Sequence, residues 1–230
     1  MRWAMVQSCF GSFEEGEYCS MALSTVRELG VDSAMDFRVI GLTGGMGAGK
    51  SVVARMLQGL GYPVYDADAA AKRQYDTDPD LLGAVVARFG NSILDDSGIL
   101  DRRKLSDVVF SDAEALASLN ALVHPVVARD FQLWREKCRE NGARFVFREA
   151  AILFESGSNQ DCDAVWGVSA PFSLRVERIR KRSKWPEAEI LQRMSKQWSE
   201  EKVLARCDAI LINDGRHSVV NQVLTLVEQL

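Results

Sequence analysis

Five short apolar segments alternate along the chain with longer segments in which apolar residues recur every three or four positions. The short segments are rich in Val, Ile and Phe and predict buried strands, whereas the longer periodicity predicts amphipathic helices. Strands that alternate with helices along a chain usually form a parallel sheet. The pattern therefore predicts an α/β domain with a five-stranded parallel sheet, its strands at residues 37–43, 63–65, 144–149, 164–168 and 209–212.

Between the second and third strands lies a long, mostly helical stretch, residues 69–142, with an irregular turn at residues 90–101. Within it Pro125 is expected to begin a new helix, because proline is favoured in the first helical turn. A helical insertion of this kind usually forms a lobe over the active edge of the sheet. Two more helices are expected within residues 173–198, and an amphipathic helix is expected near the end of the chain, at residues 219–227.

The first 35 residues differ in character from the rest of the chain. Acidic residues soon interrupt their apolar start, and no apolar stretch followed by a small-residue cleavage site is present. We expect this extension to be a loosely packed tail or an unused upstream start, with a helical turn at Thr25–Leu29. Met35 stands directly before the first strand and would be a natural start for a compact domain at residues 36–230.

Composition narrows the class of protein. The net charge of −4 and the pI near 5.4 argue against a nucleic-acid or membrane-surface binder. Five scattered cysteines without a C-x-x-C pair predict neither a disulfide framework nor a zinc site, and they fit a reducing cytoplasm. No apolar run approaches the roughly 18 residues of a membrane span. A soluble cytoplasmic protein is therefore expected.

One motif carries most of the chemical information. The segment that begins at Gly44 and ends at Ser51 fits the pattern G-x-x-x-x-G-K-[ST] between a predicted strand and a predicted helix. Glycines let successive backbone N–H groups wrap a polyphosphate, while Lys50 would reach the β and γ phosphates and Ser51 would hold Mg²⁺. The expected ATP-binding residues of the loop are Gly44, Gly45, Met46, Gly47, Ala48, Gly49, Lys50, Ser51 and Val52.

Two carboxylates, Asp66 and Asp68, follow the second strand, at the sheet edge where ligands of parallel α/β folds bind. Either could act as a general base for an acceptor hydroxyl or as a Mg²⁺ ligand through water. Asp68 could instead be an ordinary helix cap, and the residues alone do not decide between these roles. The other candidate, His124, is expected on sequence grounds to be a buried, hydrogen-bonded structural residue.

A basic cluster lies on the predicted helix after the fourth strand. It consists of Arg175, Arg178, Arg180, Lys181, Arg182 and Lys184. Most of these residues suit a solvated helix end, where the helix dipole favours cations. Arg178 and Arg182, one turn apart, could instead form a lid that stabilises a transferring phosphoryl group. Arg193 and Gln197 repeat the same spacing and could join that site.

Taken in order, these residues resemble the dephospho-CoA kinase family over residues 36–230. The matching landmarks are Gly41-Leu42-Thr43-Gly44-Gly45, Asp66-Ala67-Asp68, Leu100-Asp101-Arg102, Leu122-Val123-His124-Pro125, Ile152-Leu153-Phe154-Glu155, Arg182, Arg193 with Gln197, and Asn213-Asp214-Gly215. The sequence departs from the family pattern at Glu149-Ala150-Ala151, where a proline two positions after the acidic residue is common. The extension before Met35 has no counterpart in the family.

The resemblance implies a P-loop nucleoside-monophosphate-kinase-like fold with three α/β/α layers, a helical acceptor lobe at residues 69–142 and a lid at 173–198. It implies transfer of the ATP γ-phosphoryl group to the ribose 3′-hydroxyl of dephospho-CoA, with Mg²⁺. Asp68 would accept or orient the hydroxyl proton, Arg102 and His124 would lie near the acceptor, and Arg182 would belong to the lid over ATP. Asp66, beside Asp68, and Arg178, one turn before Arg182, are further candidates for the acceptor site and the ATP site. A monomer or small homo-oligomer without nucleic-acid or membrane partners is expected.

Three alternatives compete with this interpretation. The phosphate loop alone also fits a kinase that acts on a nucleoside monophosphate or a shikimate-like acceptor. A nucleotide-gated switch is a second alternative, although the sequence has no N-K-x-D segment on a late strand. A nucleic-acid-binding ATPase is the third, and it conflicts with the acidic net charge.

Overall fold

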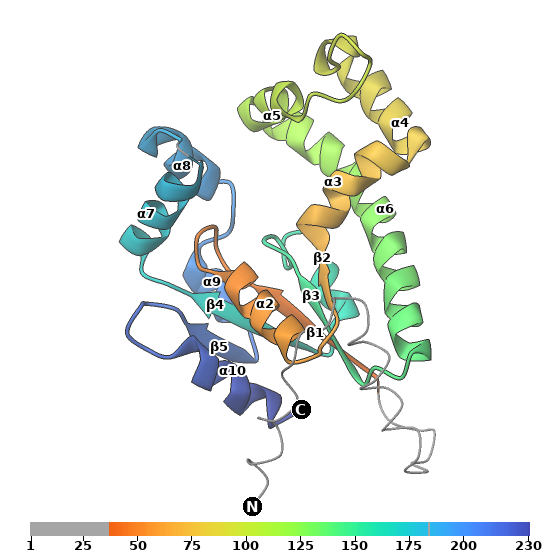
Figure 1. Cartoon of the computed structure of the whole chain (residues 1–230). Coiled ribbons are helices and arrows are strands. Elements are labelled where there is room, and N and C mark those ends of the chain that lie inside the picture. Colours follow the sequence, from red (N-terminus) through yellow and green to blue (C-terminus); the bar gives the residue numbers. More distant parts are fainter. Residues whose placement is uncertain (1–36, 184) are drawn as a thin grey trace, which may run out of the picture. The chain divides into compact units, whose positions relative to one another are not determined.

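The computed structural model describes residues 37–183 and 185–230, except for the side chains of residues 110 and 111. The expectations for residues 1–35, including the helical turn at Thr25–Leu29, lie outside the described residues. A five-stranded sheet forms the centre of residues 37–230 (Figure 1). Its strands are β1 (Arg38–Thr43), β2 (Val64–Asp66), β3 (Phe145–Glu149), β4 (Ala164–Ser169) and β5 (Ala209–Ile212).

The strands lie in the order β2-β3-β1-β4-β5, and every neighbouring pair is parallel. The predicted parallel sheet is therefore confirmed, and its strands fall within a residue or two of their expected positions. Because β1 is central, the loop that follows it opens at the middle of the carboxyl edge, between the ends of β3 and β4. This is the usual ligand-binding edge of a parallel α/β sheet.

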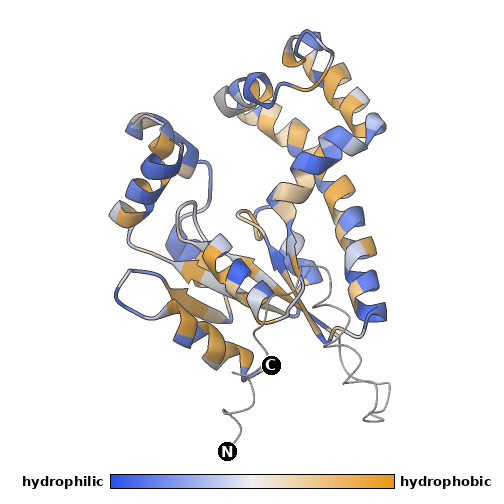
Figure 2. Cartoon of the chain, viewed as in Figure 1, coloured by the Kyte–Doolittle hydropathy of each residue, from blue (hydrophilic) through white to orange (hydrophobic). Residues whose placement is uncertain are grey.

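Helices cover both faces of the sheet. The helices α2 (Lys50–Gly59) and α10 (Val219–Val227) pack on one face, where Ile40, Phe147 and Leu211 are buried with them. The helix α6 (Ala113–Glu140) packs on the other, where its Phe131 meets Val146. Figure 2 shows apolar residues concentrated in the sheet and in α10, whereas α7 (Phe172–Ser183) is largely hydrophilic. The three-layer α/β/α core predicted from the sequence is confirmed.

The helical insertion consists of α3 (Ala67–Thr77), α4 (Pro79–Phe89), a short 3₁₀ turn at Asn91–Ile93, α5 (Arg102–Ser111) and the long α6. An aspartate caps each of the four α-helices, since the carboxylates of Asp66, Asp78, Asp101 and Asp112 accept backbone N–H groups of the first turns. The predicted irregular turn is confirmed at residues 90–101, where Leu94 and Leu100 form an isolated bridge.

The predicted helix start at Pro125 is wrong, because Pro125 lies inside the continuous helix α6. Proline removes one intrahelical hydrogen bond and usually interrupts a helix. Here the buried face continues across it at a spacing of four residues, through Leu119, Val123, Val127 and Phe131. Packing of this face against the lobe and the sheet therefore keeps α6 continuous.

The region after β4 holds α7, α8 (Glu187–Met194) and α9 (Glu200–Leu204). The first two agree with the helices expected within residues 173–198, whereas α9 was not predicted. Ile179, Ile190 and Met194 form a small apolar core between α7 and α8. Among the described residues, no helix combines the length and the apolar character that crossing a membrane requires.

Candidate active site

The loop between β1 and α2 has a conformation that depends on its glycines. Gly44 has a φ of 145°, and a side chain there would collide with the carbonyl oxygen of Val168 on β4. A side chain at Gly47, with a φ of 80°, would lie 2.6 Å from the carbonyl oxygen of Arg175. The loop is therefore packed closely between β4 and α7, and only glycine fits at these positions.

Lys50 is the first residue of α2 and is buried. Its Nζ donates a hydrogen bond to the carbonyl oxygen of Gly44, at 2.8 Å, so the amine lies across the loop that it follows. Burial lowers the pKa of this amine, although the nearby charges of Asp68 and Glu149 act in the opposite direction. An anion bound in the loop would favour the protonated amine.

Side chains from α7 brace the loop from outside. Arg175 is buried, donates from Nε to the carbonyl oxygen of Met46 at 3.0 Å, and pairs with Glu200 at 3.1 Å. Arg178 donates to the carbonyl oxygen of Ala48 at 3.3 Å. Both arginines come from the predicted basic cluster, but their guanidinium groups hold backbone carbonyls of the loop.

Two amide side chains complete this support. The Gln197 Oε1 accepts the N–H of Met46 at 3.0 Å, and the Asn213 Nδ2 donates to the carbonyl oxygen of Ala48 at 2.8 Å. Asn213 also accepts two hydrogen bonds from Arg178, at 3.1 Å each. The structure thus brings Gln197 to the loop, as the sequence suggested. Sequence reasoning missed the bracing roles of Arg175 and Asn213, although both lay in segments that it had singled out.

The other two basic residues of interest lie farther from the loop. Arg182 is exposed in the last turn of α7, and its charge helps to lower the pKa of Lys50. Arg193 pairs with Glu189, lies over the Trp185 ring, and reaches Ser106 of the helical lobe at 3.4 Å. Arg193 therefore links α8 to α5, whereas Gln197, four positions further on, contacts the loop.

The two aspartates after β2 have separate roles. The Asp66 carboxylate caps α3 by accepting the N–H of Ala69 at 2.8 Å, so the cap is Asp66 and the Asp68 side chain is left to face a cavity. The protein around Asp68 desolvates its carboxylate and raises the pKa above the usual value, and Asp66 adds to this rise. The positive charge of Lys50 opposes the rise, which places Asp68 within electrostatic reach of the loop.

A third carboxylate, Glu149, lies at the end of β3 beside this pair. It is opposite Asp66 of β2 and Leu42 of β1 in the sheet register. Burial raises the pKa of Glu149 to about 7, with Lys50 opposing the shift and the two aspartates adding to it. From the sequence, Glu149 stood out only as the last residue of a predicted strand and as part of a departure from the family pattern. Its place at the end of a central strand was the signal that could have identified it.

The cavity that Asp68 faces has a volume of about 210 Å³. Its walls come from α3, α6 and the segment 150–158 that follows β3, and its polar lining includes Tyr75, Asn120, His124, Arg148, Ser156 and Ser158. His124 is half-buried, and burial, with the charge of Arg148, lowers the pKa of its imidazole. A neutral ring that lines a cavity can contact a ligand. The residues alone favoured a structural histidine, whereas the position near the acceptor that the resemblance implies for His124 stays a prediction.

Arg102 lies apart from the residues that line the cavity. Its Nη2 donates to the carbonyl oxygen of Lys72 at 2.9 Å and to the carboxylate of Asp76 at 2.6 Å, so it joins α5 to α3. The role near the acceptor that the resemblance implies for Arg102 stays a prediction.

A glycine loop between a central strand and a helix, with a lysine and a serine at the helix start, defines a P-loop fold. A carboxylate lies between that loop and a separate cavity, and the class of protein that this fold and site define is a P-loop kinase. Comparison with known proteins agrees: the profile of the dephospho-CoA kinase family matches residues 38–218. The chain belongs to the dephospho-CoA kinase family and is an ATP-dependent enzyme of the kinase class.

Individual relatives cover nearly the whole described part. The dephospho-CoA kinase of Porphyromonas gingivalis is 39% identical over 190 residues, which are 82% of this chain and 92% of the relative. That of Chlorobaculum tepidum is 38% identical over 202 residues, covering 83% and 97%. A solved structure from Thermus thermophilus is 36% identical with a TM-score of 0.73, covering 84% of this chain and 97% of its own. The dephospho-CoA kinase structure from Campylobacter jejuni, 24% identical with a TM-score of 0.59, covers 83% and 95% and shares the fold.

Proposed function

We propose that this enzyme transfers the γ-phosphoryl group of ATP to the ribose 3′-hydroxyl of dephospho-CoA, which yields CoA and ADP. The observation that carries the proposal is the position of Asp68. Its carboxylate lines the cavity between α3 and α6, and the charge of Lys50 acts on it. A hydroxyl held in that cavity would face the phosphate loop with a carboxylate at hand.

The phosphates of ATP would bind to the backbone amides of residues 44–52, with the positive end of the α2 dipole behind them. Lys50 would then exchange the Gly44 carbonyl for the β and γ phosphates. The nucleotide base would enter the open cavity of about 410 Å³ beside the loop after β5, lined in part by Leu174, Asp214 and Arg216. Arg178 and Asn213, which join this region to the loop, support such a continuous nucleotide site.

Mg²⁺ is the expected partner of the phosphates. Among the described residues, no group of three or more histidines, cysteines or acidic residues could hold a metal alone. This fits Mg²⁺, which usually takes one or two protein oxygens together with phosphate oxygens and water. The exposed Ser51 hydroxyl would be its protein ligand, and Asp68 would reach it through water. Bound Mg²⁺ would neutralise phosphate charge during transfer.

Asp68 would accept or orient the proton of the acceptor hydroxyl. Its raised pKa suits this task, because a base whose pKa lies nearer to the working pH holds a transferred proton better. In a loose phosphoryl-transfer transition state, positioning and charge stabilisation supply most of the rate and the base a smaller part. Arg182, exposed on the lid, would add positive charge when the lid helices approach the nucleotide.

We also propose that the enzyme works in the cytoplasm as a monomer or small homo-oligomer. Cys138, Cys162 and Cys207 are free thiols, which are usual in a reducing compartment. Sedimentation of the purified protein measures its oligomeric state.

The test is ADP release by the purified protein with Mg-ATP, in parallel assays that contain dephospho-CoA, AMP, CMP, shikimate or no acceptor. The product mass is read in each assay. Strong stimulation by dephospho-CoA alone, with CoA as the product, is expected. Turnover with another acceptor would leave the kinase class standing and reject the named acceptor, whereas slow hydrolysis without any acceptor would indicate a nucleotide switch.

A further inference from the structure

A buried arginine lies where the sheet meets the acceptor cavity. Arg148 is the fourth residue of β3, and its side chain is only 2% exposed. It points toward α6, as its strand neighbour Val146 does, and it lines the cavity together with Val127 and His124. A charged side chain inside a strand is unusual, because a charge is rarely buried without several partners.

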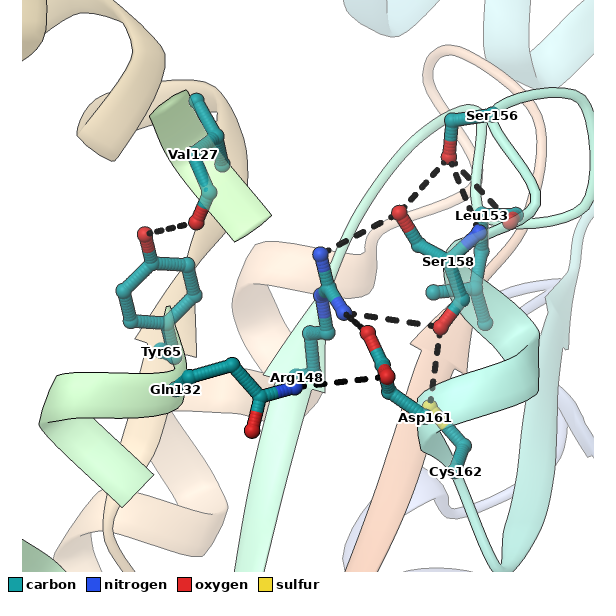
Figure 3. Close-up of polar contacts among 9 residues, drawn as sticks. All are labelled: Tyr65, Val127, Gln132, Arg148, Leu153, Ser156, Ser158, Asp161 and Cys162. Atoms are coloured by element: carbon teal, nitrogen blue, oxygen red, sulfur yellow. Dashed lines mark hydrogen bonds and ion pairs between the residues drawn. The ribbon is translucent and has the colours of Figure 1, made fainter. Parts of the chain in front are cut away.

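The guanidinium of Arg148 lies between α6 and the segment that follows β3, and Figure 3 shows its polar contacts with Ser158 and Asp161. Its Nη1 pairs with the Asp161 carboxylate at 2.8 Å, and its Nη2 donates to the Ser158 hydroxyl at 3.1 Å. On the other side, its central carbon lies 4.3 Å from the ring centroid of Phe131 on α6. The planar group therefore fills the space between α6 and the segment that follows β3.

The partners of Arg148 extend the network in both directions. The second oxygen of Asp161 accepts a hydrogen bond from Gln132 of α6 at 3.3 Å. The hydroxyls of Ser156 and Ser158 are hydrogen-bonded at 2.9 Å, and Ser156 donates to the carbonyl oxygen of Leu153 at 3.3 Å. Ser156 and Ser158 themselves line the cavity. The network thus joins β3, α6 and the segment 150–161, which carry the cavity walls.

A contribution to the stability of the fold does not by itself explain why Arg148 is buried with these partners. A buried ion pair often contributes no more to folding than apolar residues of similar size would. In addition, the Nε of Arg148 is buried and, among the described groups, has no hydrogen-bond partner. A buried guanidinium can instead fix one geometry of its surroundings, because its planar set of N–H groups can donate to its partners in only a few orientations.

We propose that Arg148 is a positioning residue of the acceptor site, which fixes the segment 150–161 relative to α6 and so sets the affinity for the acceptor. The inference rests on the proposed function, because it takes this cavity to be the acceptor site. Arg148 makes no bond to the reacting groups. Arg148 therefore affects the affinity for the acceptor and not the affinity for ATP, because other side chains brace the phosphate loop.

The test compares Arg148→Met with Arg144→Met. Arg144 is an exposed residue just before the same strand and lies near the Phe145 ring, with its central carbon 5.6 Å from the ring centroid, outside the cavity lining. For Arg148→Met, the KM for dephospho-CoA is expected to rise about tenfold, with the KM for ATP within about twofold. Arg144→Met should leave both KM values unchanged. Equal rises in both KM values, or no rise in a folded variant, would overturn the proposal.

A second variant covers the case in which Arg148→Met does not fold. Asp161→Asn keeps the shape of its side chain and its contact with Gln132 but weakens the pairing with Arg148, so a smaller rise in the same KM is expected. Binding of dephospho-CoA and of a non-hydrolysable ATP analogue, measured by calorimetry, gives the same comparison without turnover. If wild-type protein does not bind dephospho-CoA, the proposed function fails. If wild type binds it and both variants bind it equally well, only the role of Arg148 fails.

Discussion

The two halves of the active site are built in different ways. In the phosphate loop the groups that would meet the ligand are backbone amides, and Arg175, Gln197 and Asn213 hold the loop backbone in place from outside. In the acceptor cavity the side chains themselves form the surface, as His124 and Arg148 do. Substitutions near the loop should therefore act on its conformation, whereas substitutions in the cavity should act on the choice and affinity of the acceptor.

The largest effect is expected for Lys50→Ala, which removes the amine that lies across the phosphate loop and is proposed to reach the phosphates. Turnover should fall by about 10³-fold or more, the size found for charge-stabilising groups in phosphoryl transfer. The measurement is kcat with saturating Mg-ATP, with Lys137→Ala on the exposed end of α6 as the control. Near-normal kcat in Lys50→Ala would contradict the assignment of the loop.

Asp68→Asn tests the point where the two halves meet. We expect kcat to fall by about two to four orders of magnitude, the usual contribution of a positioned base. ATP binding should remain intact, because Asp68 contributes no bond to the loop. Asp66→Asn is the comparison, since asparagine can still cap α3 and should lose far less activity. Wild-type turnover by Asp68→Asn would remove Asp68 from the mechanism.

Glu149→Gln tests the electrostatics of the carboxyl edge through stability. The pKa of Glu149 is raised from 4.5 to about 7 in the folded state, so the folded protein binds this proton more tightly than the unfolded chain does. The contribution of Glu149 to wild-type stability is therefore lost as the pH rises from about 4.5 to 7, whereas the glutamine variant has no such contribution to lose.

The free energy of unfolding of Glu149→Gln minus that of wild type should therefore increase as the pH rises. The increase should reach on the order of 2 to 3 kcal/mol above pH 7. Urea denaturation at pH 5 and pH 8, without nucleotide, measures the difference. A difference that does not change with pH would mean that the carboxyl is already ionised at pH 5.

Arg178→Met should weaken the bracing of the loop without touching the acceptor cavity. The KM for ATP is expected to rise about tenfold, because the contacts with Ala48 and Asn213 are lost. The KM for dephospho-CoA should stay within about twofold. Arg180→Met, an exposed neighbour on the same helix, is the matched control. A rise in the KM for dephospho-CoA alone would contradict the bracing role of Arg178 and would assign it to the acceptor site.

The smallest effect is expected for Arg102→Met. Its ion pair with Asp76 is about half-exposed on both sides, at 47% and 54%, and such pairs contribute at most about 1 kcal/mol to stability. The acceptor KM should change less than in Arg148→Met, since Arg102 contacts α3. An equally large rise would instead support the acceptor role that the resemblance implies for Arg102.

The sequence predicted best those features whose cause is local. The phosphate loop could be read directly, because its backbone geometry at Gly44 and Gly47 requires glycine. The strands were predicted from their apolar runs alone. The predicted helix start at Pro125 was wrong, because a proline that would break an isolated helix is tolerated where packing before and after it holds the helix together.

Features that depend on distant contacts could not be predicted. Arg178 lies 131 positions from Gly47, and Arg175 lies 129 from Met46, so their bracing of the loop has no local signal. Arg148 followed an apolar run and was taken as part of a strand, without an indication that its charge is buried. Its partner Asp161 belongs to a segment whose path depends on the whole sheet.

The carboxyl end of β3 has a consequence for how such an enzyme can diverge. Successive side chains of a strand point to opposite faces, so Arg148 lies on the α6 side while Glu149 interacts with Lys50 and Arg55 on the α2 side. Within this part of β3, Arg148 thus faces the proposed acceptor cavity, whereas Glu149 lies within electrostatic reach of the phosphate loop. Substitution at a single position could alter the choice of acceptor in a descendant enzyme while its ATP chemistry is inherited unchanged.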